Sequence, residues 1–198
     1  GIESRARIAV DTVEQGGASK ESQIPLYQNP DWAKGYDVVI HDECFGAVAD
    51  TNWIARILAP HRAGLPGVNL HCAMHSYRVV KDFARPQAPG SPGALWFDFL
   101  GLQSSGHGPQ SPVAITYTNT SHPITKGLAN WTTINEELYN NVQPPSAFPR
   151  HTSLASGRQT QTNKKDGTKK EAEAVVVWTN EFGPKKARVF CTTIGHNN

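Results

Sequence analysis

The chain has 198 residues, enough for one domain of ordinary size with a core that needs no disulfide bonds. No run of residues approaches the roughly 20 apolar positions of a membrane-spanning helix, which excludes a membrane partner. Nineteen basic and 17 acidic residues leave a net charge of +2, too weak a field to favour nucleic acid. We therefore expect a soluble globular protein.

Three cysteines, Cys44, Cys72 and Cys191, cannot all pair within one chain. Each lies at the end of an apolar run, where a small buried thiol is stable. We predict that all three remain free thiols.

The first half of the chain alternates helical and strand patterns. Helices are predicted over residues 4–15, which end at a pair of glycines, and over residues 50–63, where apolar side chains recur at helical spacing. Short β-branched runs predict buried strands near residues 36–40 and 65–70. This alternation is typical of a parallel sheet with helices on both faces.

The second half holds a long loop and further strands. Frequent prolines and glycines predict a loop over residues 85–112, with a short helix around residues 96–100. Further strands are predicted near residues 113–117, 131–134, 174–179 and 187–193. The last two form an antiparallel hairpin. We therefore predict one α/β domain over residues 1–198, with a flavodoxin-like three-layer sandwich whose central sheet is mostly parallel.

Histidines gather where two predicted strands end. His41 follows the first strand, and His71 and His75 follow the second, four residues apart. Ligands bind at the carboxyl ends of the strands in a parallel sheet, so these side chains are candidates for a site. The spacing of His71 and His75 fits a metal pair, or a polar pocket that hydrogen-bonds a sugar with Tyr77 and Arg78 nearby. We prefer the polar pocket.

Four segments, taken in this order and spacing, resemble the ThuA-like (trehalose-utilisation) family. They are Val68–His75, Ser121–Leu128, Glu136–Tyr139, and Val176–Thr179 together with Arg188–His196. The resemblance implies the fold of class I glutamine amidotransferases and a role in the use of trehalose or a related disaccharide. Compared with the family pattern, we expect this chain to lack the first strand and the C-terminal helix.

The resemblance also implies that glutamine hydrolysis is absent. In an amidotransferase, the turn after the second strand carries a nucleophilic cysteine, and a late histidine and glutamate complete a triad. Here His71 occupies that turn and Cys72 is one residue out of register. His196 matches the late histidine, but Asn198 stands where the glutamate is expected, so nothing orients the imidazole.

Candidate residues follow from the strand ends and the family pattern. The candidate catalytic residues are His71, His75, Glu137 and His196. The candidate substrate-binding residues are His41, Tyr77, Arg78, His107, Tyr139 and Trp178. Glu137 is chosen because the family's glutamate directly precedes a Leu-Tyr pair, and a carboxylate that anchors a backbone turn is the alternative. Trp178 either stacks on a sugar ring or belongs to the core.

Three functions stay open at this point. The first is a carbohydrate-processing protein that acts on trehalose, a related disaccharide or a keto sugar. The second is a non-catalytic sugar-binding or interaction module. The third is a metal-dependent hydrolase or isomerase with a divalent ion such as zinc on His71, His75 or His196, and no other cofactor is expected. Whether the chain is an enzyme, and whether it forms a homo-oligomer, stay open.

The expected partner is a small-molecule carbohydrate. The expected location is the cytoplasm or periplasm of a bacterium.

Overall fold

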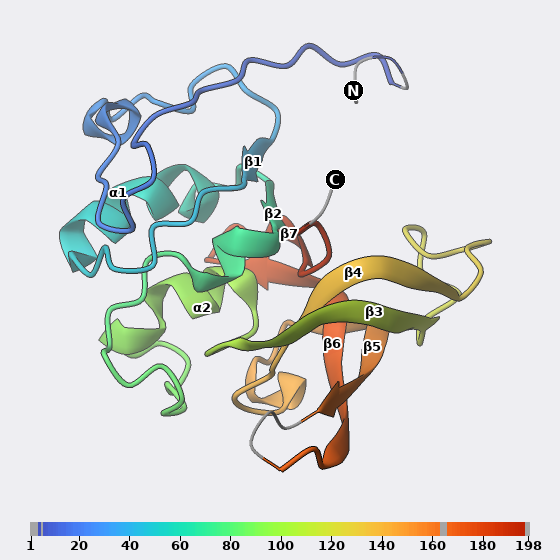
Figure 1. The fold of residues 1–198 in the computed structure, drawn as a ribbon. Coiled ribbons are helices and arrows are strands. Elements are labelled where there is room, and N and C mark those ends of the chain that lie inside the picture. The colour runs from blue at the N-terminus through green and yellow to red at the C-terminus, as the bar shows by residue number, and fades with distance from the viewer. Residues whose placement is uncertain (1–3, 5, 163–165, 197–198) are drawn as a thin grey trace.

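Seven strands form one sheet in the part of the chain that the computed structural model describes, residues 4, 6–162 and 166–196 (Figure 1). The strands are β1 (Val39–His41), β2 (Gly67–Leu70), β3 (His107–Tyr117), β4 (Trp131–Tyr139), β5 (Thr152–Thr162), β6 (Lys169–Phe182) and β7 (Ala187–Thr192). Their order across the sheet is β1-β2-β7-β6-β5-β3-β4.

The sheet is mixed and mostly antiparallel, so the predicted flavodoxin-like sandwich with a parallel centre is wrong. Only β1–β2 and β2–β7 pair in parallel, and every other neighbouring pair is antiparallel. Parallel strands need a crossover connection, usually a helix. Between β3 and β7, the described residues contain only the short 3₁₀ helix η5 (Pro145–Ala147). Without crossover helices, neighbouring strands there pair antiparallel, and β4 and β5 lie on opposite sides of β3.

Each of the six predicted strands overlaps a strand of the structure, and β6 and β7 form the predicted antiparallel hairpin. Two parts of the sheet were not predicted. β3 begins at His107, inside the segment predicted to be a loop. β5 is mostly polar and its buried side chains do not alternate from end to end, so its sequence carries no clear strand period.

Two helices lie beside the parallel end of the sheet (Figure 1). α1 (Thr51–Arg62) is confirmed, and the Asp50 side chain caps it by accepting two backbone N–H groups of the first turn. α2 (Leu95–Leu100) is also confirmed and ends at Gly101, whose φ of 74° is left-handed. Among the described residues, no helix is long and apolar enough to cross a membrane.

The predicted helix over residues 4–15 is wrong. Residues 8–15 have no regular structure, and Ile8, Val10 and Val13 are 45%, 42% and 48% exposed. A short helix is only marginally stable in water unless one face packs against the protein. Because these apolar side chains do not reach the core, nothing stabilises a helix here.

The core has two parts. The larger one surrounds α1 and α2 and includes Trp53, Ile57, Trp96 and Phe99. The smaller one lies among β3, β4, β5 and β6 and is centred on side chains such as Val113. The larger cluster also includes Trp178 and Phe182 of β6, so it extends from the parallel strands into the antiparallel part of the sheet.

Candidate functional site

His71 stands at the sharp turn after β2. The chain passes directly from the strand into the 3₁₀ helix η3 (His71–His75), and His71 has a φ of 34°, which few residues other than glycine adopt. Its Nδ1 donates to the carbonyl oxygen of Thr193, 2.6 Å away. This bond places a proton on Nδ1, so Nε2 carries the lone pair when the ring is neutral.

Side chains from distant segments converge on Nε2 of His71. His196 Nδ1 lies 3.2 Å from this nitrogen and Glu137 Oε2 lies 3.5 Å from it. Glu137 Oε2 is also 3.5 Å from His196 Nδ1. We call His71, Glu137 and His196 the His–Glu cluster. The phenol oxygen of Tyr139 borders it, 3.3 Å from His71 Nε2.

The pairing of β3 with β4 places the polar neighbours of Glu137. Gln110 lies directly opposite Glu137, and His107 lies opposite Tyr139. Gln110 Nε2 donates to Glu137 Oε1 at 3.2 Å and lies 2.6 Å from His196 Nε2. His107 Nδ1 is 3.6 Å from Glu137 Oε1. Glu137 itself is only 7% exposed, so these neighbours largely replace water around its carboxylate.

Glu136 holds the loop that carries His196. Its side chain is 2% exposed, and Oε1 accepts the backbone N–H groups of Gly195 and His196 at 2.9 and 3.0 Å. The backbone-anchoring role that was considered for Glu137 thus falls to its neighbour. The two adjacent glutamates therefore have different roles. Glu137 belongs to the His–Glu cluster, and Glu136 fixes the loop of His196.

His75 faces Tyr139 rather than the His–Glu cluster. The two rings stack with centroids 4.2 Å apart and planes 8° apart, and His75 Nε2 lies 2.9 Å from Ser104 Oγ. Burial lowers the pKa of His75 to about 3, so its imidazole is neutral. His107 stacks on Tyr139 as well, at 5.5 Å. Tyr139 is therefore held among three histidines, His71 included.

The other predicted substrate-binding residues lie apart from the His–Glu cluster. His41, Tyr77 and Trp178 are at most 1% exposed and belong to the core. Arg78 lies over the ring of Phe83, with its guanidinium carbon 3.6 Å from the ring centroid. In the described part of the chain, none of these four side chains makes a hydrogen bond or ring contact with the cluster.

The thiols are free, as predicted. Cys72 follows His71 and hydrogen-bonds to Cys44, and this bond together with burial raises the pKa of the Cys72 thiol. The same bond lowers the pKa of Cys44 to about 7. Cys72 is therefore a thiol rather than a thiolate at neutral pH. Asn198, expected in place of a triad carboxylate, lies outside the described residues.

A second set of polar side chains, His41, Glu43 and His61, lies at the core. His41 Nδ1 lies 2.9 Å from Glu43 Oε1, and His41 Nε2 lies 3.1 Å from His61 Nε2. His61 Nδ1 donates to the Leu65 carbonyl at 2.8 Å, so its Nε2 must accept from His41. Both ring nitrogens of His41 are then donors, which makes it an imidazolium paired with the Glu43 carboxylate. Burial, with the adjacent His41 charge, lowers the pKa of His61 to about 3.

We expect acid to destabilise the fold through His61. The folded protein keeps this imidazole neutral down to about pH 3, whereas the unfolded chain protonates it below about pH 6.5. Between these values the unfolded state binds more protons, so the free energy of unfolding falls by about 1.4 kcal/mol for each unit by which the pH is lowered. Glu43, whose pKa is lowered to about 2 by His41 against the effect of burial, adds to this slope below about pH 4.5, where only the unfolded chain protonates it.

Urea unfolding as a function of pH measures this slope. His61→Gln keeps hydrogen-bonding groups but cannot titrate, so the slope should decrease by one proton. An unchanged slope in the variant would show that His61 does not carry the effect.

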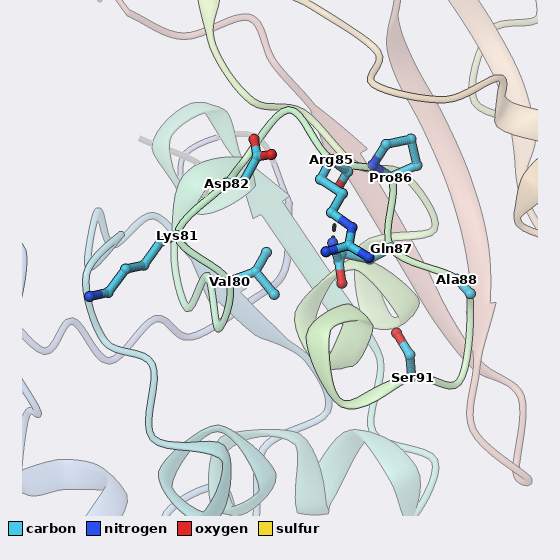
Figure 2. Close-up of a pocket in the computed structure, with 8 residues that line it drawn as sticks. All are labelled: Val80, Lys81, Asp82, Arg85, Pro86, Gln87, Ala88 and Ser91. Atoms are coloured by element: carbon cyan, nitrogen blue, oxygen red, sulfur yellow. Dashed lines mark hydrogen bonds between the residues drawn. The ribbon is translucent and has the colours of Figure 1, made fainter.

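Two pockets differ in their relation to the His–Glu cluster. One of about 540 Å³ is formed by the loop from Val80 to Ser91, and no residue of the cluster lines it (Figure 2). Another, of about 420 Å³, is lined in part by His107 and Tyr139 but by no residue of the cluster. Because His107 and Tyr139 neighbour Glu137 and His71, the second pocket lies one side chain away from the cluster.

Sequence reasoning missed three supporting groups. Gln110 lay in a predicted loop, and only the β3–β4 register reveals that it faces Glu137. The Thr193 carbonyl belongs to the backbone, which sequence motifs do not report. Glu136 was visible as the neighbour of Glu137, but its role depends on where the loop of His196 passes.

Comparisons with known proteins agree on one family. The sequence profile of a family described as ThuA, trehalose utilisation, matches residues 4–198. No curated protein sequence matches the chain.

Two crystal structures of proteins described as ThuA-like are similar in fold. The protein from Bacteroides uniformis is 19% identical with a TM-score of 0.57, and the match covers 87% of this chain and 65% of that one. The protein from Parabacteroides merdae is 18% identical with a TM-score of 0.57, covering 84% and 62%. The chain thus spans less than two thirds of either protein, and at this identity the likeness concerns the fold alone.

Proposed function

The chain belongs to the ThuA family of trehalose utilisation, and we propose that it processes a carbohydrate through the imidazoles and carboxylate of the His–Glu cluster. The proposed substrate is trehalose, a related disaccharide or a keto derivative. One observation carries the proposal: His71 Nε2, Glu137 Oε2 and His196 Nδ1 lie within 3.2 to 3.5 Å of one another although they come from three separate segments. Titrating groups in such mutual contact are typical of acid–base sites.

His71 is the proposed proton acceptor. Its Nδ1–H bond to the Thr193 carbonyl leaves the lone pair of Nε2 free to take a proton. The Glu137 carboxylate, 3.5 Å away, would stabilise the imidazolium that results. His196 contacts both groups and is exposed, so it provides a route for the proton to and from solvent.

The second pocket is the proposed binding place for the sugar. It is lined by amide and charged side chains as well as by His107 and Tyr139, and these groups suit the many hydroxyls of a carbohydrate. The buried Nδ2 of Asn141, one of its lining residues, has no hydrogen-bond partner among the described residues.

Two observations support a protein without glutamine amidotransferase activity. The residue at the strained turn after β2 is His71, with its φ of 34°, so the thiol of Cys72 comes one position later. That thiol is engaged by Cys44 rather than by an imidazole. A nucleophilic cysteine needs an adjacent base, which Cys72 lacks among its described hydrogen bonds.

We expect Cys72→Ser to leave carbohydrate turnover unchanged, within about twofold. The assay incubates the full-length protein with trehalose and with its keto derivative and follows products by chromatography. Glutamine serves as the parallel substrate, and no ammonia should be released. Loss of turnover in Cys72→Ser, or hydrolysis of glutamine, would show that the Cys72 thiol takes part in the reaction. Saturable sugar binding without any product would instead favour the non-catalytic module.

A further inference from the structure

We propose that the His–Glu cluster binds one divalent transition-metal ion of the zinc class. The inference rests on the proposed function for its chemical purpose, because the ion would act on the same substrate, with His71 Nε2 then serving as a ligand instead of the proton acceptor. The sequence left a metal open on His71, His75 or His196. The geometry replaces His75 by Glu137, since His75 is engaged by Ser104 and Tyr139.

The three ligand atoms already form the face of a tetrahedral site. Zinc binds histidine nitrogen and carboxylate oxygen at about 2.0–2.1 Å, so two ligand atoms of a tetrahedral site lie about 3.3 Å apart. In the cluster the separations are 3.2 Å between His71 Nε2 and His196 Nδ1, and 3.5 Å from each to Glu137 Oε2. An ion at zinc–ligand distance from all three atoms would sit about 0.6 Å out of their plane, close to the tetrahedral value of about 0.7 Å.

Hydrogen bonding alone does not account for this arrangement. His71 Nδ1 donates to the Thr193 carbonyl, so the neutral ring presents a lone pair at Nε2 beside the Glu137 carboxylate. Both contacts to Glu137, at 3.5 Å, are longer than good hydrogen bonds. A cation would satisfy all three lone pairs at once.

The surroundings are those of a supported metal site. A ligating histidine commonly donates its other N–H to a carbonyl or carboxylate, which is what His71 does to Thr193. Gln110 contacts the far side of both other ligands, Glu137 Oε1 and His196 Nε2. Ligation by His196 Nδ1 needs its ring proton on Nε2, so the Gln110 amide would have to turn its carbonyl to that nitrogen and give up its bond to Glu137 Oε1, whose carboxylate the ion would then neutralise. Glu136 fixes the backbone of His196.

Three protein ligands leave the fourth position open, as in catalytic zinc sites. The phenol of Tyr139 lies 3.3 Å from His71 Nε2, and Tyr139 also lines the second pocket. A sugar hydroxyl or keto oxygen in that pocket is therefore the proposed fourth ligand, which the ion would polarise as a Lewis acid.

Calorimetric titration of the chelator-treated, untagged full-length protein with ZnCl₂ tests the inference. We expect one ion per chain, and we expect Glu137→Gln and His196→Ala each to weaken binding by more than about 100-fold. Gln110→Ala, which removes only a supporting group, should weaken it by about 10–100-fold. His122→Ala, a change at a turn histidine outside the cluster, should have no effect. Since His196 is exposed, its variant should fold normally, which circular dichroism checks.

Cobalt provides a second readout without substrate. Co²⁺ bound by two imidazoles and a carboxylate in four-coordinate geometry should give visible ligand-field absorption that Glu137→Gln abolishes. Absence of saturable zinc binding, or binding that survives both Glu137→Gln and His196→Ala, would overturn the inference. Sugar turnover by chelator-treated protein would also overturn the metal's part and leave the proposed function standing. Zinc binding without any turnover would support the metal site and contradict the proposed function.

Discussion

Replacement of His71 by asparagine is expected to lower kcat/KM for the sugar substrate by about 10²–10⁴-fold, the usual contribution of a general acid–base residue. Asparagine cannot accept a proton at the position of Nε2, which is where Glu137, His196 and Tyr139 converge. The same change removes a ligand if an ion occupies the cluster. The loss should therefore appear whichever chemistry the cluster supports.

The choice of asparagine separates chemistry from folding. His71 has a φ of 34°, and asparagine tolerates the left-handed region better than most residues. His71→Ala should lose activity equally but should also lower the free energy of unfolding, because alanine is strained at positive φ. Guanidinium unfolding of both variants measures the difference. Near-normal turnover by a folded His71→Asn protein would remove His71 from the mechanism.

Local patterns predicted the elements that depend on local sequence. Asp50 and the spacing of apolar residues after it identify α1, and short β-branched runs identify β1 and β2. The arrangement of the sheet depends instead on how distant strands pair. β5, which lies between β3 and β6 and makes that end of the sheet antiparallel, is polar and was not recognised. One unrecognised strand was enough to make the predicted fold class wrong.

The site was predictable only in part for a similar reason. Family motifs singled out His71, Glu137 and His196, which the structure brings together. A predicted strand end indicates where a residue lies along the sheet, but not which face of the sheet its side chain occupies. In β1 the apolar Ile40 is 41% exposed while the polar His41 is fully buried, which reverses the expected pattern. The reversal depends on Glu43 and His61, which sequence spacing alone does not connect to it.

That buried pair gives the largest expected effect on stability. Glu43 Oε1 accepts three hydrogen bonds, from His41 Nδ1 at 2.9 Å, Tyr77 OH at 2.8 Å and Tyr27 OH at 3.1 Å. Glu43→Gln removes the charge while keeping the size of the side chain. The His41 imidazolium is then left in the core without a counter-charge. Breaking a buried ion pair from one side costs about 3–5 kcal/mol, which is the upper limit for the loss in the free energy of unfolding, because His41 can relieve part of the cost by losing its proton.

The double variant His41→Phe with Glu43→Leu provides the matched control. It removes both charges, and apolar replacement of a whole buried pair is often close to neutral. We therefore expect guanidinium unfolding to rank the double variant as more stable than Glu43→Gln alone, even though it carries more changes. The Glu43→Leu change would leave the hydroxyls of Tyr27 and Tyr77 without their acceptor, so the double variant should still be about 1–3 kcal/mol less stable than the natural chain. If Glu43→Gln costs less than about 1 kcal/mol at pH 5, where the unfolded chain protonates its histidines, His41 is neutral in the folded protein and the proton assignment along Glu43, His41 and His61 is wrong.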